Sequence, residues 1–199
     1  MPADPWFVSD DPETEAELDR TERAFVGALR ERAEAWKVPP AVSWVGRPDD
    51  DSSLVACVGL GDGPFGWPPL IGLHLTGSTV SGDHLNEHFY FLPQPRTRLA
   101  LDATGTPQTL AALSADWFER VLRMRVVRHE WYHDGRRYAD RYLFGDDGDG
   151  RCDTYIDGVA PQGQREYLKA IGAEDTGRWI RSGALGRPGR IVALRHAAD

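Results

Sequence analysis

Apolar residues recur at helical spacing in the first part of the chain. Within residues 11–36, Leu18, Phe25, Leu29 and Trp36 are spaced 7, 4 and 7 positions apart, so they form one apolar stripe with charged residues opposite. Two further stretches are predicted to be helical, and the first of them opens with Thr106-Pro107, a suitable start for a helix. Three helices are predicted in total, at about 11–36, 107–124 and 162–172.

Between these helices the hydrophobic pattern changes to short runs rich in β-branched and aromatic residues. Loops rich in Asp, Gly and Pro separate the runs, which is typical of strands joined by turns. Residues 84–92 (HLNEHFYFL) fit a strand or a short helix, and both alternatives stay open. The predicted strands cover about 41–46, 53–59, 70–76, 125–133, 136–144, 151–157 and 190–195.

This order of elements predicts an α+β fold, in which an antiparallel sheet of several short strands is packed by about three helices. A chain of 199 residues is long enough for one domain with its own core, so we expect a single domain over residues 1–199. A weak internal duplication, matching residues 11–92 with 107–195, is an alternative, because both stretches run from a helix into strands.

The dipeptide Asp134-Gly135 between two alternating runs is the strongest hairpin signal in the chain. A two-residue turn fixes the register, and residues that oppose each other across the hairpin lie on the same side of it. One predicted side carries aromatic residues, and the other carries Arg128, Arg137 and Arg141. The predicted pairs on the aromatic side are His133–Arg136, Trp131–Tyr138, His129–Asp140 and Val127–Tyr142.

The aromatic side of this hairpin holds the candidate catalytic residues. Asp140 beside His129 would raise the basicity of the imidazole and fix its tautomer, as a general base requires. Trp131, Tyr138 and Tyr142 are candidate binding residues, because together they could form an aromatic wall for a small molecule. The alternative, which we favour, is that the aromatic residues are core and that His129 and Asp140 form a buried, mutually satisfied pair.

The other side of the hairpin is the candidate surface for a charged partner. Arg128, Arg137 and Arg141 are predicted to share it, and Arg128 would lie opposite Arg141, which is unfavourable unless an acidic group lies close. We expect that acidic group to be internal, such as Glu130 or the acidic segment 11–19, rather than supplied by a partner.

Residues 84–88 spell H-x-x-E-H, the pattern of inverted zinc peptidases. On a helix, His84 and His88 would share a face and hold Zn²⁺, while Glu87 would activate the bound water. The strand-forming residues 89–91 that follow argue against a helix, and no third ligand stands at a recognisable spacing. We therefore expect no bound metal and no other cofactor.

Composition narrows the class of protein further. A net charge of −8 argues against a general affinity for nucleic acid or anionic membranes, and no apolar run is long enough to span a bilayer. Acidic residues stand near the start, where a signal peptide needs basic and apolar ones, so we expect a cytoplasmic protein. Arg outnumbers Lys by 21 to 2, a usage that suggests a GC-rich bacterial genome. Cys57 and Cys152 belong to no disulfide or zinc motif.

These observations favour a non-catalytic, intracellular protein that binds a protein partner, of the docking or immunity type. Small size, acidity, seven Trp residues and the lack of a complete catalytic motif support this hypothesis. Two alternatives stay open. The first is a small metal-dependent or His/Asp-dependent hydrolase, and the second is a small-molecule binding domain that uses the aromatic side of the hairpin.

Overall fold

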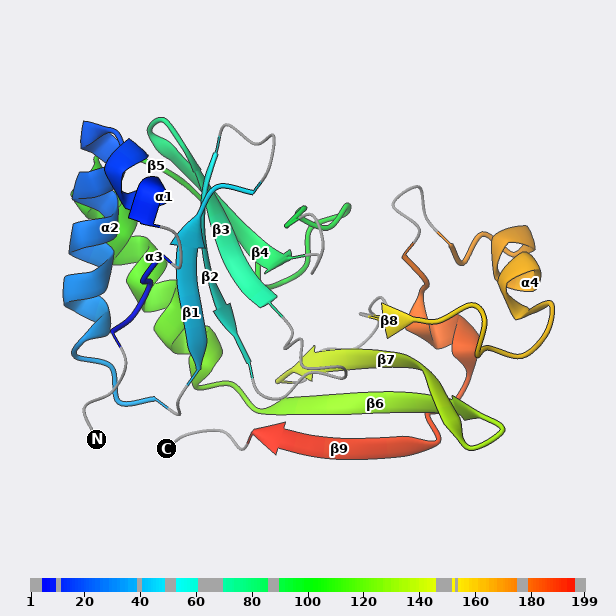
Figure 1. The fold of residues 1–199 in the computed structure, drawn as a ribbon. Coiled ribbons are helices and arrows are strands. Elements are labelled where there is room, and N and C mark those ends of the chain that lie inside the picture. Colours follow the sequence, from blue (N-terminus) through cyan, green and yellow to red (C-terminus); the bar gives the residue numbers. More distant parts are fainter. Residues whose placement is uncertain are drawn as a thin grey trace. The chain divides into compact units, whose positions relative to one another are not determined.

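The computed structural model describes residues 5–9, 12–38, 41–48, 53–60, 70–85, 90–145, 152, 154–174 and 179–195. The chain divides into two compact units, Met1–Arg123 and Met124–Asp199, and each is described by itself (Figure 1). The described residues form four α-helices and two antiparallel sheets, so the predicted α+β class is confirmed. None of the helices in these ranges has both the length and the apolar character needed to cross a membrane.

The first unit is built on a five-stranded sheet whose strands follow one another in chain order. Each strand pairs antiparallel with the next, as short connections favour. Figure 1 shows helices α2 (Arg20–Ala33) and α3 (Pro107–Leu122) together on one face of this sheet. The strands are β1 Val42–Gly46, β2 Leu54–Gly59, β3 Leu70–Thr76, β4 Thr79–Leu85 and β5 Leu101–Thr104.

The predicted helix 11–36 is interrupted at residues 18–19, so the prediction of one continuous helix is wrong. Two helices occupy the stretch, α1 (Pro12–Glu17) and α2. Asp19 is the N-cap of α2: its carboxylate accepts a hydrogen bond from the backbone N–H of Glu22, and the Glu22 carboxylate accepts one from the backbone N–H of Asp19, both at 2.8 Å. This capping box satisfies the first N–H groups of a new helix, so it starts α2 despite the continuous apolar stripe.

Two strands of the first unit, β4 and β5, were not predicted. The β4 sequence TVSGDHL contains Gly82 and Asp83, which are both unfavourable in strands on propensity alone. Gly82 has a packing role, because a Cβ atom at this position would lie 3.2 Å from the ring of Trp117 on α3. Of the ambiguous segment 84–92, the first two residues are strand, and residues 86–89 lie outside the described residues.

The core of the first unit lies between α2, α3 and the sheet. Phe25 and Leu29 of α2 and Phe118 of α3 have no exposed surface, and β2 is buried along its whole length. A strand buried on both faces needs cover on each side. On the face away from the helices, Cys57 and Leu85 pack with Trp44 and Tyr90 in a smaller apolar cluster.

The second unit contains a four-stranded antiparallel sheet in the order β8-β7-β6-β9. The predicted hairpin is confirmed, and Asp134 and Gly135 have φ values of 47° and 73°. Two consecutive left-handed residues define the type I′ turn that Asp-Gly favours. The elements are β6 Val126–His133, β7 Arg136–Phe144, β8 Thr154–Tyr155, α4 Gln164–Ala170, the 3-10 helix η2 Ser182–Leu185 and β9 Arg190–Arg195.

A β-bulge at Tyr138 shifts the register of this hairpin. Tyr132 pairs with Arg137 but Trp131 pairs with Ala139, so Tyr138 is an extra residue on β7. Because side chains alternate along a strand, one extra residue reverses the faces beyond it. The predicted pair His133–Arg136 is confirmed, and the other three are wrong. The observed pairs are Trp131–Ala139, Glu130–Asp140, His129–Arg141, Arg128–Tyr142 and Val127–Leu143.

One face of this sheet packs on the core of the second unit. Trp131 is 4% exposed, and its Nε1 donates a hydrogen bond to the carbonyl oxygen of Gly186 at 3.1 Å. Trp131 and Tyr138 are thus core residues, as the favoured interpretation of the aromatic residues expects. The buried residues of this core are Trp131, Tyr138, Ala139, Cys152, Leu168, Ala173 and Ile180.

Candidate functional site

The face of the second sheet opposite this core carries a cluster of charged residues around Glu130. Glu130 on β6 and Asp140 on β7 lie directly across from each other, and both side chains are buried. Two buried carboxylates on neighbouring strands require positive charge close by. Arg137 supplies part of it, because its Nη1 lies 2.7 Å from Glu130 and its Nε lies 3.5 Å from Asp140.

Glu130 accepts hydrogen bonds from three side chains. Arg128 Nε donates to it at 2.8 Å, Arg137 Nη1 at 2.7 Å, and the Tyr132 hydroxyl at 2.7 Å. Arg190 of β9 lies at the edge of the cluster, with its Nε 3.9 Å from Glu130. Burial raises the pKa of Glu130, but the hydrogen bonds from Tyr132 and Arg137 and the charge of Arg128 outweigh it, so the net pKa is lowered.

The predicted arginine surface is therefore only partly correct. Arg128 and Arg137 share a face and are held by Glu130, the internal acid that the sequence suggested. Arg141 lies on the opposite, core face, where it is 5% exposed and its Nη1 donates to Ser182 Oγ at 3.1 Å. The predicted contact between Arg128 and Arg141 does not occur, because the bulge places Arg128 opposite Tyr142.

The predicted aromatic wall is divided between the two faces of the sheet. Trp131 and Tyr138 face the core, and the ring of Tyr138 meets that of Tyr155 edge-on at 5.9 Å. Tyr142 lies on the other face, buried under Arg128, whose guanidinium carbon is 6.0 Å from the ring centroid. The prediction that all three form one wall is wrong, because it depended on the register without the bulge.

The His129–Asp140 pair, the candidate catalytic dyad, is also not formed. His129 lies opposite Arg141 and on the other side of the sheet from Asp140. Burial lowers the pKa of His129, and the positive charge of Arg141 lowers it further. A carboxylate partner would raise the basicity of this imidazole, and the arginine has the opposite effect.

The H-x-x-E-H motif is described only at its start. His84 belongs to β4 and not to a helix, and Glu87 and His88 lie outside the described residues. Across the residues that the structure describes, no group of three or more His, Cys, Asp or Glu side chains has the arrangement of a metal site. The expectation of no bound metal stays a prediction.

Sequence reasoning missed a serine–histidine pair in the first unit. Ser53 Oγ lies 2.6 Å from His74 Nδ1, and His74 Nε2 lies 2.7 Å from the carbonyl oxygen of Tyr90. A carbonyl can only accept, so in the neutral imidazole Nε2 carries the proton and Nδ1 accepts from the Ser53 hydroxyl. Tyr90 has a φ of 55°, which is strained for a residue other than glycine. The pair joins positions 21 residues apart, so no local motif indicates it.

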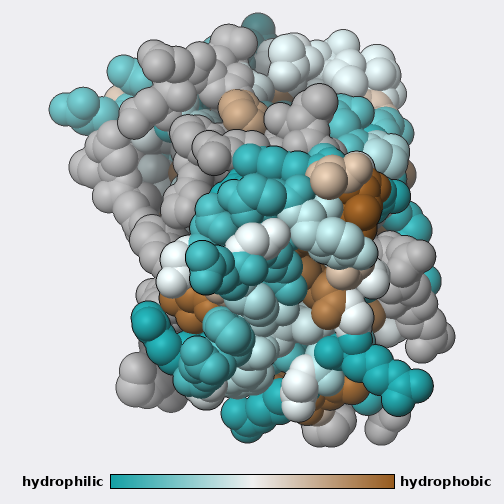
Figure 2. Space-filling model, turned by 90° about the vertical axis from the view of Figure 1, so that its right-hand side faces the viewer, coloured by the Kyte–Doolittle hydropathy of each residue, from teal (hydrophilic) through white to brown (hydrophobic). Residues whose placement is uncertain are grey.

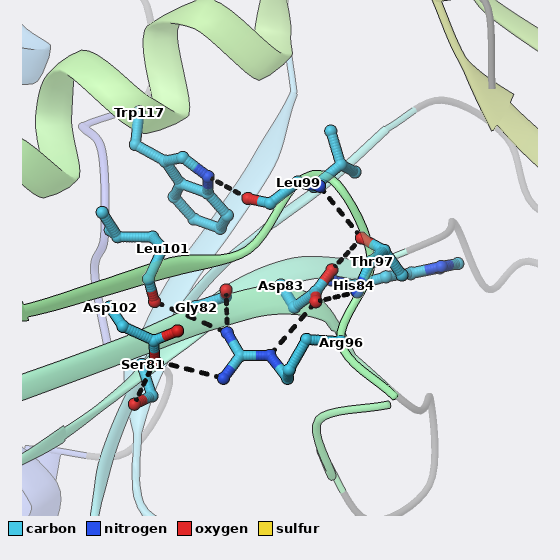
Figure 3. Close-up of polar contacts among 10 residues, drawn as sticks. All are labelled: Ser81, Gly82, Asp83, His84, Arg96, Thr97, Leu99, Leu101, Asp102 and Trp117. Atoms are coloured by element: carbon cyan, nitrogen blue, oxygen red, sulfur yellow. Dashed lines mark hydrogen bonds and ion pairs between the residues drawn. The ribbon is translucent and has the colours of Figure 1, made fainter. Parts of the chain in front are cut away.

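A buried carboxylate in β4 organises the other polar cluster of the first unit (Figure 3). Asp83 accepts hydrogen bonds from the backbone N–H groups of His84 and Thr97, both at 2.8 Å, and from the Thr97 hydroxyl. The Arg96 guanidinium adds an ion pair at 3.2 Å. Leu99, farther along the segment that contains Arg96 and Thr97, accepts a hydrogen bond at its carbonyl oxygen from Trp117 Nε1 of α3 at 2.7 Å. These contacts fasten residues 96–99 to β4 and α3.

The outer side of β9 forms an edge of the second sheet. Among the described strands, β9 pairs only with β6. Its residues Arg190 and Ile191 have exposed fractions of 66% and 61%. Elsewhere in this unit Tyr167 and Ile171 are also exposed. On the face drawn in Figure 2, apolar residues form separate brown spots among hydrophilic ones, so that face offers no single large apolar patch.

These features define the class of protein as an α+β protein with two antiparallel sheets, each holding a buried carboxylate cluster. Comparisons with protein-family models, with curated proteins and with solved structures find no match to this chain.

Proposed function

We propose that this chain is a non-catalytic protein-interaction protein of the docking type, and that β9 receives the partner. One observation carries the proposal: β9 is an edge strand of six residues with exposed apolar and basic side chains. The backbone of an edge strand can pair with a strand of another protein, and exposed side chains then add specificity.

The neighbouring arginine cluster supports this choice of edge. The other edge of the same sheet is β8, which has only two residues, whereas β9 extends along five positions of β6. Arg128 and Arg137 are fixed by Glu130, so β9 is supported by an ordered, positively charged strand pair. A rigid, charged edge favours binding of a specific partner over non-specific association. Cys57 and Cys152 are both buried thiols, which fits the reducing, cytoplasmic location that we propose for this activity.

Site-specific photocrosslinking in the native cells tests the proposal. A benzoylphenylalanine at position 191 should give one discrete adduct with a protein, because Ile191 lies on the proposed edge. The matched control is the same replacement at Ile171, an exposed isoleucine of the same unit that follows α4. Adducts of equal yield at both positions, or none at position 191, would reject β9 as the docking strand.

A serine hydrolase is the second candidate function, and the Ser53–His74 pair is the observation that favours it. A hydroxyl that donates to an imidazole held by a carbonyl is a nucleophile next to its base. Ser53 is only 4% exposed, which limits access by a substrate. A fluorophosphonate probe should label Ser53 of the folded protein and fail on His74→Gln if this candidate is correct. No labelling of the wild type removes it.

A further inference from the structure

We propose that the segment that docks on β9 is an extended acidic strand, one of whose Asp or Glu side chains binds Arg190. This inference rests on the proposed docking function and names the chemistry of the partner. An acidic partner strand requires three features of β9. The strand must lie at an edge, the charge around it must be positive, and its side chains must alternate in a way that an acidic strand can match.

The local charge is positive although the chain as a whole is negative. Residues 179–195 contain four arginines and no acidic residue, whereas the net charge of the chain is −8. At about 0.1 M salt the Debye length is about 10 Å, so acidic residues far from β9 are largely screened. An acidic segment at β9 therefore experiences mainly the nearby arginines.

Arg190 is the residue best placed to bind an incoming carboxylate. Glu130 lies 3.9 Å from it but already accepts shorter hydrogen bonds from Arg128, Arg137 and Tyr132. Glu130 is buried, while the side chain of Arg190 is 66% exposed. The guanidinium has five N–H donors in a fork that suits a carboxylate. Arg190 can therefore keep its contact with Glu130 and still bind a second carboxylate from the solvent side.

The alternation along β9 specifies the pattern of the partner strand. Arg190 and Val192 lie on one face of the sheet, and Ile191 and Ala193 lie on the other. Ile191 and Ala193 are exposed. A partner strand that alternates acidic and apolar residues would set its carboxylates beside Arg190 and its apolar side chains beside Ile191. A second copy of this chain fits poorly, because its β9 would bring arginines to arginines.

A synthetic peptide that alternates Glu and Val over eight residues is the probe, with binding followed by fluorescence anisotropy on the full chain. The control peptides are the Lys-Val counterpart and the Glu-Val peptide methylated at every backbone nitrogen. We expect the Glu-Val peptide to bind at least about 10-fold more tightly than either control, because it alone combines charge complementarity with backbone pairing. Raising the salt concentration should weaken its binding through screening.

Charge reversal of one arginine locates the site. Arg190→Glu should weaken binding of the Glu-Val peptide by about 10-fold, and Arg190→Gln, which adds no carboxylate beside Glu130, should weaken it in the same direction. Arg136→Glu is the matched control, because Arg136 is exposed on the hairpin and outside β9. It should change binding by less than about 2-fold. Thermal melts of all three variants establish that they fold.

Four outcomes overturn the inference. They are tight binding of the fully methylated peptide, equal loss in Arg136→Glu and Arg190→Glu, competition by a single-stranded oligonucleotide at equal charge, and dimerisation of the chain that blocks the peptide. The crosslinking experiment separates this inference from the proposed function. A discrete protein adduct at position 191 without binding of the acidic peptide would keep the docking function and reject the acidic partner.

Discussion

A buried carboxylate organises a polar cluster in each sheet, and these two carboxylates, Asp83 and Glu130, are satisfied in different ways. Asp83 in the first unit is held mainly by groups of the adjoining segment, including two backbone N–H groups. Glu130 in the second unit is held by three long side chains and has a partly exposed arginine at its rim. The first arrangement fastens a loop, whereas the second orders a set of cations beside an open edge.

The two units also differ in their balance of acidic and basic residues. Met1–Arg123 contains 19 acidic and 10 basic residues, whereas Met124–Asp199 contains 12 acidic and 13 basic residues. The second unit therefore has more than enough basic residues to neutralise its buried carboxylates, Glu130 and Asp140. The comparison teaches that similar buried carboxylates can leave their cations differently exposed, since Arg96 beside Asp83 is 24% exposed and Arg190 at the rim of the Glu130 cluster is 66% exposed.

The largest expected effect is the loss of the Asp83 side chain. Asp83→Ala should lower the free energy of unfolding by about 3 kcal/mol, because it leaves the N–H groups of His84 and Thr97 and the Nε of Arg96 without the acceptor that they share. Urea denaturation of the full chain measures this change. Asp102→Ala is the control: Asp102 also pairs with Arg96, at 3.2 Å, but its side chain is 60% exposed. We expect a change below about 1 kcal/mol there.

Loss of the Glu130 carboxylate should have a smaller effect on stability. Glu130→Gln should cost about 2 kcal/mol, because the charge is lost but the Gln amide oxygen can still accept a hydrogen bond from Arg128, Arg137 or Tyr132. Tyr132→Phe, which removes one donor to the same carboxylate, should cost about 1 kcal/mol or less. A loss for Glu130→Gln that equals or exceeds that of Asp83→Ala would contradict the distinction between the two clusters.

The pH dependence of stability should reflect the lowered pKa of Glu130. Its pKa is below the ordinary value of 4.5 in the folded chain, so the unfolded state binds the proton more tightly. The stability from this group is therefore present above pH 4.5 and is lost as the pH falls through the lower folded pKa. Glu15, whose pKa is lowered by a hydrogen bond from Arg30, acts in the same direction.

A comparison of two acid titrations isolates Glu130. The slope of unfolding free energy against pH below 4.5 should be shallower in Glu130→Gln than in the wild type. Glu15→Gln serves as the second reference, because Glu15 is a carboxylate of the first unit whose pKa is also lowered. Identical slopes for the wild type and Glu130→Gln would show that Glu130 does not contribute to the loss of stability at low pH.

The smallest expected effect concerns zinc. The purified chain should hold well below one zinc per chain, because His84 lies on a strand and its backbone N–H is engaged by Asp83. Elemental analysis after dialysis measures the metal content. One zinc per chain that is lost in His88→Ala would contradict this prediction and restore the peptidase hypothesis.

The sequence predicts those elements whose signals are local. The hairpin at Asp134-Gly135 is predicted because both turn residues favour a left-handed backbone, and β9 is predicted because an apolar run follows the turn at 186–189. β4 was missed because Gly82 and Asp83 are poor strand formers. Gly82 leaves room for the ring of Trp117, and Asp83 binds residues 96 and 97. Both contacts are between residues distant in sequence, so no local pattern predicts them.

The candidate site was predicted less well, for a physical reason. The residue types were correct, since Arg128 and Arg137 do surround Glu130, and this acid was expected near them. Their partners across the hairpin were wrong because the bulge at Tyr138 has no signature in the sequence. The Ser53–His74 pair depends on two strands meeting, so it could be found only after the register of the sheet was known.

The extra residue at Tyr138 decides which side chains of β7 face the core. A regular hairpin of the same length would pair Trp131 with Tyr138 and would exchange the faces of Asp140 and Arg141. Deleting Tyr138 would remove the bulge and keep Ala139 opposite Trp131 and Asp140 opposite Glu130. The hairpin can therefore lose one residue beside its turn and keep its interior and exterior, whereas the same deletion beyond Ala139 would turn each later side chain of β7 to the opposite face.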